Sequence, residues 1–393
     1  MPNVLSKWVE KKLALPKSDE TPEQLPFLPP VRPRVLTPSP SRESLVQSAE
    51  AATSHSAFFQ KLPVEIRRKI LKEAFGMFAM HMHLSLEYPR VPLKDRTPQD
   101  SRRHASIPHV PNTSEAQKPP KRFGIPKQKT WQWFGCICHR SWPSVLSQWQ
   151  PYWSGWYSPD MDKCVTGGSC ECGEWPGEAP GKCFIGAMGW LLSCRQSYAE
   201  GIDVLYSTNR IHMSNQFMVL HLPQLILPQR LASITSVELI WNVAPRKTDV
   251  PIPPDSWGLP DLHTLMNMVV SSLTGLQYLS LTLDCDIDPK GRIEQDEQNP
   301  TISNPFDDFV RRLRPRLMGC DIAIPSLFFD ERKQRSEPTE KVWDVSRRQD
   351  EKRLWRELPH ADDGEHEKLP MNQRGYWVSS GRYCNLGLVC MGF

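Results

Sequence analysis

Six of the eleven cysteines fall within one short stretch, where thiols and an imidazole suggest a metal site. Structural zinc takes four thiolate or imidazole ligands, and its binding can order a segment that builds a poor core. A structural zinc is therefore one interpretation of this stretch, and its ligands would be Cys164, Cys170, Cys172 and Cys183. Further candidates are Cys136, Cys138 and His139. We favour a stretch of reduced cysteines without metal, since Cys-x-Cys replaces the wider spacing usual in zinc sites, and we therefore predict no cofactor. Disulfides would require an oxidising compartment.

Positive charge next to aromatic rings is a second chemical feature, and it suits single-stranded nucleic acid. The basic residues are Lys118, Lys121, Arg122, Lys127 and Lys129, followed by Trp131 and Trp133. The whole chain carries 48 basic and 44 acidic residues, which is too balanced for bulk nucleic-acid binding. A solvated linker explains the stretch more simply, so we assign no nucleic-acid residues. A zinc-stabilised interaction or nucleic-acid-binding module over residues 118–183 remains the alternative function.

The sequence offers little for catalysis. It contains no nucleophile elbow, P-loop, zinc-protease or dinucleotide-binding motif. Its paired carboxylates, such as Asp307 and Asp308, have no accompanying histidine, and we interpret them as helix starts and solvent-facing charge. We therefore expect a protein that is not an enzyme.

Two amphipathic segments far apart in the chain are predicted to be helices that pack together. In residues 62–75, apolar side chains recur at a spacing of four: Leu62, Ile66, Ile70 and Ala74, widened by Leu71 and Phe75. The solvent side is expected to carry Arg67, Arg68, Lys69 and Lys72. In residues 188–206, the apolar face comprises Leu191, Cys194, Tyr198, Ile202 and Leu205. Pairing the two faces would leave residues 77–184 as an irregular insert.

These helices carry a resemblance to a known family. The first contains Leu62-Pro63-x-Glu65-Ile66-Arg67-x-x-Ile70-Leu71, which resembles the opening of an F-box. The second contains Leu191-Leu192-x-Cys194-Arg195-Gln196-x-Tyr198-x-Glu200, then Leu205-Tyr206-x-x-Asn209, and resembles fungal F-box-like proteins whose domain is catalogued as of unknown function. The resemblance covers residues 56–76 and 185–285. About a hundred residues interrupt what is a compact three-helix unit in the family.

The resemblance implies a function in ubiquitin ligation. F-box proteins dock on the small adaptor subunit of cullin-type ubiquitin ligases and hold a substrate protein with a C-terminal repeat region. The positions that match the docking face are Leu62, Pro63, Ile66, Ile70 and Leu71. We therefore predict a non-enzymatic F-box-like adaptor, with the ligase subunit and an unknown substrate protein as partners.

Beyond residue 209 the apolar period changes to two. Strands are predicted at residues 235–241, 278–284 and 320–324, and their matching positions are Leu239, Leu281 and Ile324. A helix-like segment precedes each later strand. A unit that recurs about every forty residues predicts leucine-rich-like βα units over residues 209–330.

Amino-acid composition gives predictions for the two terminal segments of the chain and for the cellular compartment. Residues 1–55 are rich in proline and serine and are predicted to be a disordered arm, and residues 331–393 a charged helix and tail. The longest apolar run, residues 185–194, is short of the ~20 residues that span a membrane. We expect an intracellular protein, cytoplasmic or nuclear. The predicted fold is α+β, with an F-box-like helical region over residues 56–208 ahead of the βα units.

Overall fold

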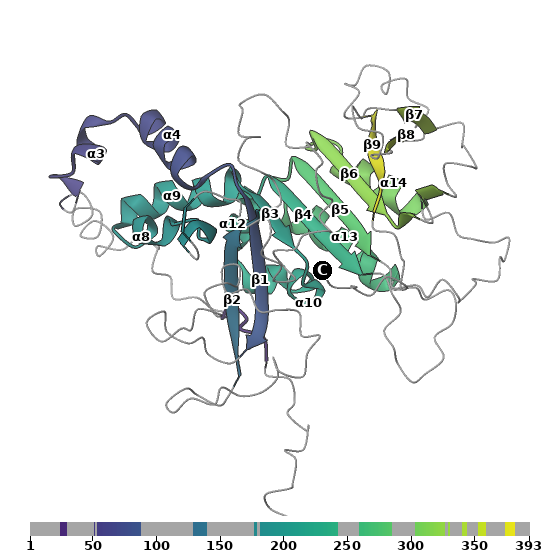
Figure 1. Cartoon of the computed structure of the whole chain (residues 1–393), viewed down its shortest axis with the longest axis horizontal. Coiled ribbons are helices and arrows are strands. Elements are labelled where there is room, and N and C mark those ends of the chain that lie inside the picture. The colour runs from purple at the N-terminus through teal and green to yellow at the C-terminus, as the bar shows by residue number, and fades with distance from the viewer. Residues whose placement is uncertain are drawn as a thin grey trace, which may run out of the picture.

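A computed structural model shows a mixed α+β fold built on one large sheet (Figure 1). The structure describes these residues: 24–29, 51, 53–87, 129–139, 177–178, 181–242, 259–284, 303–326, 329–330, 340–343, 353–358 and 374–381. Three candidate zinc ligands, Cys164, Cys170 and Cys172, lie outside them, as do the basic residues 118–127.

The described part of the sheet has nine strands in the order β2-β1-β3-β4-β5-β6-β9-β8-β7. Their bounds are β1 Ala79–Glu87, β2 Thr130–Ile137, β3 Arg210–Met213, β4 Ser236–Asn242, β5 Tyr278–Asp284, β6 Gly319–Ile324, β7 Glu340–Trp343, β8 Arg353–Glu357 and β9 Gly375–Ser380. The central run from β1 through β3, β4, β5 and β6 to β9 is parallel. The strands at the two ends, β2 on one side and β8 with β7 on the other, pair antiparallel.

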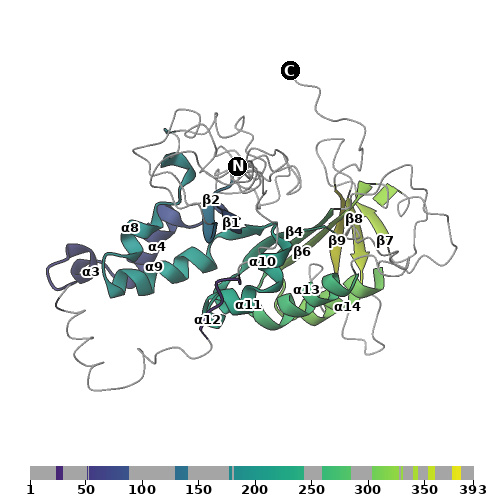
Figure 2. The ribbon, with the colours of Figure 1, turned by 90° about the horizontal axis from the view of Figure 1, so that it is seen from below.

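The helices that connect the parallel strands cover one face of the sheet (Figure 2). They are α10 Gln216–Leu220, α11 Leu222–Leu225, α12 Pro228–Ser233, α13 Leu259–Ser272 and α14 Ser303–Leu313. Parallel neighbours require such crossover connections. The main core lies between these helices and the sheet, where Leu239, Leu281 and Leu265 are almost completely buried.

The predicted strands are confirmed, with one change of register. Leu239 pairs with Leu281, as expected, but Leu281 pairs with Ile322 rather than Ile324. Successive strand residues point to opposite faces. The shift of two residues therefore keeps the same face toward the helices, so the predicted core residues are still buried.

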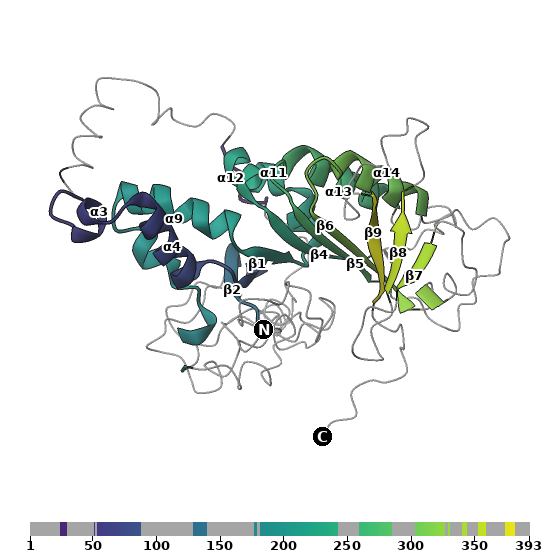
Figure 3. The same cartoon turned by 90° about the horizontal axis from the view of Figure 1, so that it is seen from above.

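A small helical unit lies beside one end of the sheet (Figure 3). It contains α3 Ala57–Lys61, α4 Val64–Phe75, α8 Ala187–Leu191 and α9 Arg195–Ser207. The 3-10 helix η5 Gly181–Cys183 lies just before α8 in the chain. The helix predicted over residues 62–75 is confirmed as α4, with Pro63 as its N-cap and Gly76 as its C-cap. The predicted second helix is divided in two at Cys194, which is the N-cap of α9.

Asn209 connects the helical unit to the sheet. Its buried amide donates to the carbonyls of Phe75 and Leu205, both at 2.9 Å, and its Oδ1 accepts from Phe78 N at 2.8 Å. One side chain therefore joins the end of α4, the end of α9 and the approach to β1.

The prediction of an irregular insert over residues 77–184 is wrong for residues 79–87 and 130–137, which form two strands. β1 follows α4 almost directly, and β2 pairs with it along its length. Met80, Met82 and Leu84 contact the main core, while the alternating histidines face the other side of the sheet. Successive side chains of a strand point to opposite faces of the sheet. The alternation of apolar residues and histidines in residues 79–87 is therefore the pattern of a strand whose two faces differ.

The predicted charged helix after residue 331 is also wrong for the described residues, which form β7, β8 and β9. Arg356 of β8 donates through Nε and Nη2 to the two oxygens of Asp307 on α14, at 2.7 and 2.6 Å. Tyr376 OH of β9 donates to the same carboxylate at 2.9 Å. Asp307 is thus buried, not solvent-facing as predicted, because it neutralises an arginine under the helix layer.

Candidate protein-docking surface

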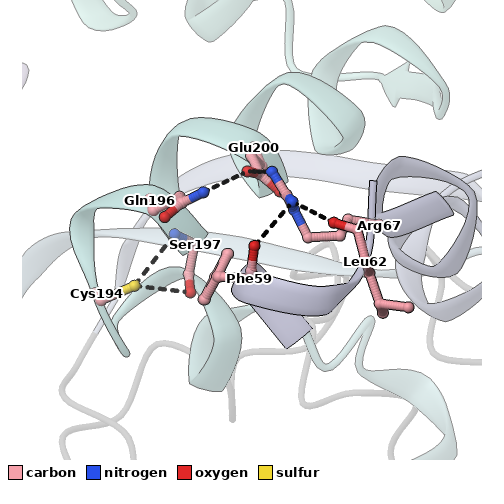
Figure 4. A network of polar contacts seen from close by, with 7 residues as sticks. All are labelled: Phe59, Leu62, Arg67, Cys194, Gln196, Ser197 and Glu200. Carbon is pink, nitrogen blue, oxygen red and sulfur yellow. Dashed lines mark hydrogen bonds and ion pairs between the residues drawn. The ribbon is translucent and has the colours of Figure 1, made fainter. Parts of the chain in front are cut away.

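A buried ion pair holds α4 against α9 (Figure 4). Arg67 donates from Nε to Glu200 Oε2 at 2.9 Å and from Nη2 to Glu200 Oε1 at 2.6 Å. Its remaining nitrogen, Nη1, donates to the carbonyl of Leu62 at 2.6 Å, and Gln196 Nε2 donates to Glu200 Oε1 at 3.0 Å. These bonds from Arg67 lower the pKa of the Glu200 carboxyl below its ordinary value.

The pairing of the two predicted helices is confirmed, but through a different face of each. Arg67 was expected in solvent, yet it is buried together with Leu71 and Phe75. On α9 the buried residues include Ile202 as predicted, whereas Tyr198 is 42% exposed. The physical reason is that an arginine paired in bidentate geometry with a carboxylate can be buried between helices.

With Arg67 turned inward, three apolar side chains of α4 are left exposed. Val64 is 50% exposed, Ile66 is 45% exposed and Ile70 is 42% exposed. Ile66 and Ile70 lie on one side of the helix together with exposed Pro63, and we call these three residues the α4 surface. Val64, two residues before Ile66, points to a different side. Apolar side chains on one exposed helix face are typical of a contact surface for another protein.

The five predicted partner-binding residues are thus divided between two environments. Pro63, Ile66 and Ile70 belong to the α4 surface, while Leu62 is half-buried beside Arg67 and Leu71 lies in the core of the helical unit.

Exposed apolar residues concentrate on the helical unit. Of the eleven large exposed hydrophobic side chains among the described residues, eight lie in or next to α4, α8 and α9. The six outside the α4 surface are Val64, Met77, Phe184, Met188, Leu192 and Tyr198. The exposed charged residues around the α4 surface are Lys61, Arg68, Lys69 and Lys72 together with Glu65 and Glu73, so its surroundings carry both signs with an excess of positive charge.

Cys194, predicted as part of the apolar face, instead starts α9. Its Sγ accepts from Ser197 N at 3.4 Å and lies 3.1 Å from Ser197 Oγ. Burial acts to raise the pKa of the Cys194 thiol, but the hydrogen bonds outweigh it, and the pKa lies below its ordinary value. This arrangement caps α9. Gln196 lies in the first turn after the cap, and Glu200 lies one turn beyond Gln196.

The structure does not bring a complete zinc site together within its described residues. Cys183 ends η5, Cys136 lies on β2, and Cys138 with His139 directly follows that strand, all of them buried. No group of three or more histidine, cysteine or acidic residues in the described part of the chain could hold a metal ion. The zinc site stays a hypothesis.

A cluster of titratable groups that was not predicted lies on the sheet face opposite the helices. Glu238 accepts from Arg210 Nη1 at 2.8 Å, and its other oxygen lies 3.3 Å from His212 Nδ1. The ring of His81 contacts the ring of His212 at 4.7 Å. Burial and these two neighbouring histidines lower the pKa of His83 to about 4. Alternating histidines in residues 79–87 were the available signal.

The comparisons with known proteins give one match. Residues 159–297 match the family model of a domain of unknown function, DUF7730. The match spans α8, α9 and the strands from β3 to β5, so the expected likeness to a domain of unknown function is confirmed there. No curated protein and no solved structure matched the chain. Among the described helices, none has the length and apolar character needed to cross a membrane.

Proposed function

We propose that this protein is a non-enzymatic adaptor that binds a partner protein through the α4 surface. The observation that supports it best is that α4 has two different sides, one packed in the helical unit and one exposed. Arg67, Leu71 and Phe75 hold the helix to the rest of the unit, while Ile66 and Ile70 make no part of that core. Ile66 and Ile70 are already more than half buried, so covering either one stabilises a complex by about half of the ~1.5–3 kcal/mol that full burial of such a side chain gives.

The proposed partner is the small adaptor subunit of a cullin-type ubiquitin ligase. The support is the F-box-like motif, three of whose matching residues, Pro63, Ile66 and Ile70, are exposed. The basic residues around them favour a partner with acidic residues at the rim of its contact surface. In the same proposal the leucine-rich-like βα units, from β3 to β6, would hold a substrate protein.

A binding experiment with matched substitutions tests the proposal. The full chain is immobilised and the purified adaptor subunit is passed over it, for the wild type and for Ile66→Asp/Ile70→Asp. We expect the double variant to bind at least tenfold more weakly, since charge is placed at the centre of the contact. The control is Met318→Asp, another exposed apolar residue, 50% exposed and outside the helical unit, which should bind like the wild type. Equal binding by the folded double variant contradicts the proposal.

A zinc-stabilised interaction module over residues 118–183 is the second candidate. The observation in its favour is that Cys138, His139 and Cys183 are each at most 2% exposed. Elemental analysis of protein expressed with ample zinc should give about one zinc per chain if this candidate holds. Less than about 0.2 zinc per chain would exclude it.

A further inference from the structure

Residues 24–29, Gln-Leu-Pro-Phe-Leu-Pro, pack on α10 and α11, beside the layer of helices (Figure 2). Leu25 is 6% exposed and belongs to the main core, and Phe27 packs against that core. The sequence predicted no packed residues within 1–55, so this segment is an exception to the predicted disordered arm. We call it the Leu25 segment.

The Leu25 segment is held by side chains more than by its backbone. Phe27 N donates to Leu25 O at 2.7 Å, which forms a three-residue turn around Pro26. Its backbone contacts the helices where Leu28 N donates to Gln224 O of α11 at 2.8 Å. The turn directs the side chains on either side of Pro26 toward the same surface, where both contact the core.

The surface under the Leu25 segment is aromatic and extends beyond it. The Phe27 ring contacts His221, between α10 and α11, at a centroid distance of 5.7 Å. His221 in turn contacts Phe217 of α10 at 4.8 Å, and Phe217 contacts Trp131 of β2 at 6.3 Å. Phe217 is still 48% exposed, so part of this ring surface is left for a longer peptide.

These contacts have the character of a linear peptide bound to a folded surface. The segment adds neither a strand nor a helix to the fold, and its prolines restrict the chain before binding, which lowers the entropy lost on docking. Residues 30–50 connect it covalently to the helical unit. A tethered ligand acts at a high effective concentration, so even weak contacts keep it in place.

We propose that the surface of α10 and α11 around His221 is a peptide-docking site for an extended Leu-Pro-aromatic-Leu segment of a partner protein. The Leu25 segment occupies this site in the free chain as an internal competitor. The site is separate from the α4 surface, and it does not depend on the adaptor function.

The test uses a fluorescent peptide of residues 22–30, PEQLPFLPP, and the full chain. Leu25→Ala/Phe27→Ala weakens the internal segment and exposes the site. We expect this variant to bind the peptide at least tenfold more tightly than the wild type does. A peptide with the same two alanines should not bind, and adding His221→Ala to the variant should weaken binding at least fivefold.

Four results would overturn the proposal. The first is no binding to a variant that is folded by circular dichroism and thermal unfolding, and the second is equal binding to variant and wild type. The third is a variant that fails to fold, because Leu25 is then an indispensable part of the core rather than a bound ligand. The fourth is a wild-type dimer that the peptide dissociates, which would identify a second copy of this chain, and not another protein, as the occupant.

Discussion

Removing the charge of Glu200 is the most informative single change in the helical unit. Glu200→Gln keeps the shape of the side chain but leaves the Arg67 guanidinium buried without its carboxylate. Breaking a buried ion pair from one side costs about 3–5 kcal/mol. Here the side chains of Arg67 and Glu200 are 10% and 17% exposed, and Arg67 keeps its bond to the Leu62 carbonyl. We therefore expect a loss of about 2–3 kcal/mol of unfolding free energy, below the full range.

Thermal unfolding of the variant and of a matched control measures this loss. At about 2–4 °C per kcal/mol, the Tm of Glu200→Gln should fall by about 4–12 °C. The control is Asp203→Asn, on the same helix, whose carboxylate pairs with Arg230 but is 60% exposed. Exposed pairs contribute about 0–1 kcal/mol, so the control should change little. Equal effects of the two substitutions would refute the argument that the buried pair holds α4 to α9.

Three further predictions concern stability. Gly201→Ala should destabilise the helical unit, because an added Cβ would lie 2.7 Å from the Trp190 ring; an unchanged Tm would contradict this packing. Asp307→Asn should cost about 3 kcal/mol in denaturant unfolding, since it removes the carboxylate that accepts both bonds from Arg356, and a cost below about 0.5 kcal/mol would argue against a buried pair. The native fold keeps His83 neutral, with a pKa of about 4 against 6.5 when unfolded, so stability is full above pH 6.5 and falls as pH drops toward 4. The loss at pH 5 is about 2 kcal/mol, and His83→Gln should remove it; an equal pH dependence in that variant would contradict the prediction.

The strands and helices that bury one clean apolar face could be predicted from the sequence. The regular alternation in residues 278–284 and the bounds of α4 at Pro63 and Gly76 are examples. The periodicity of their apolar residues indicates which side chains are buried, and the packing in the structure agrees with that pattern.

Elements stabilised by buried charge could not be predicted from periodicity. Arg67 and Arg356 look like solvent-facing residues in a sequence, because burial of an arginine depends on a carboxylate far along the chain. Their partners, Glu200 and Asp307, are 133 and 49 residues away. The face of α4 was assigned wrongly for this reason, and so were the strands after residue 331.

The Leu25 segment was missed for a different reason. Its composition, with prolines around Leu25 and Phe27, is that of a chain that builds no core of its own. Only the surface of α10 and α11 gives these side chains a place to pack, and that surface is assembled by the fold as a whole. Composition predicts whether a segment folds alone, not whether another part of the protein binds it.

Hydrogen–deuterium exchange of the full chain, with and without the purified adaptor subunit, tests the docking proposal most directly. The docking proposal predicts slower exchange over α4, at residues 62–75, when the subunit is present, with little change in β5 and β6. Unchanged exchange at α4 with saturating subunit, or protection confined to the sheet, would contradict docking through this helix.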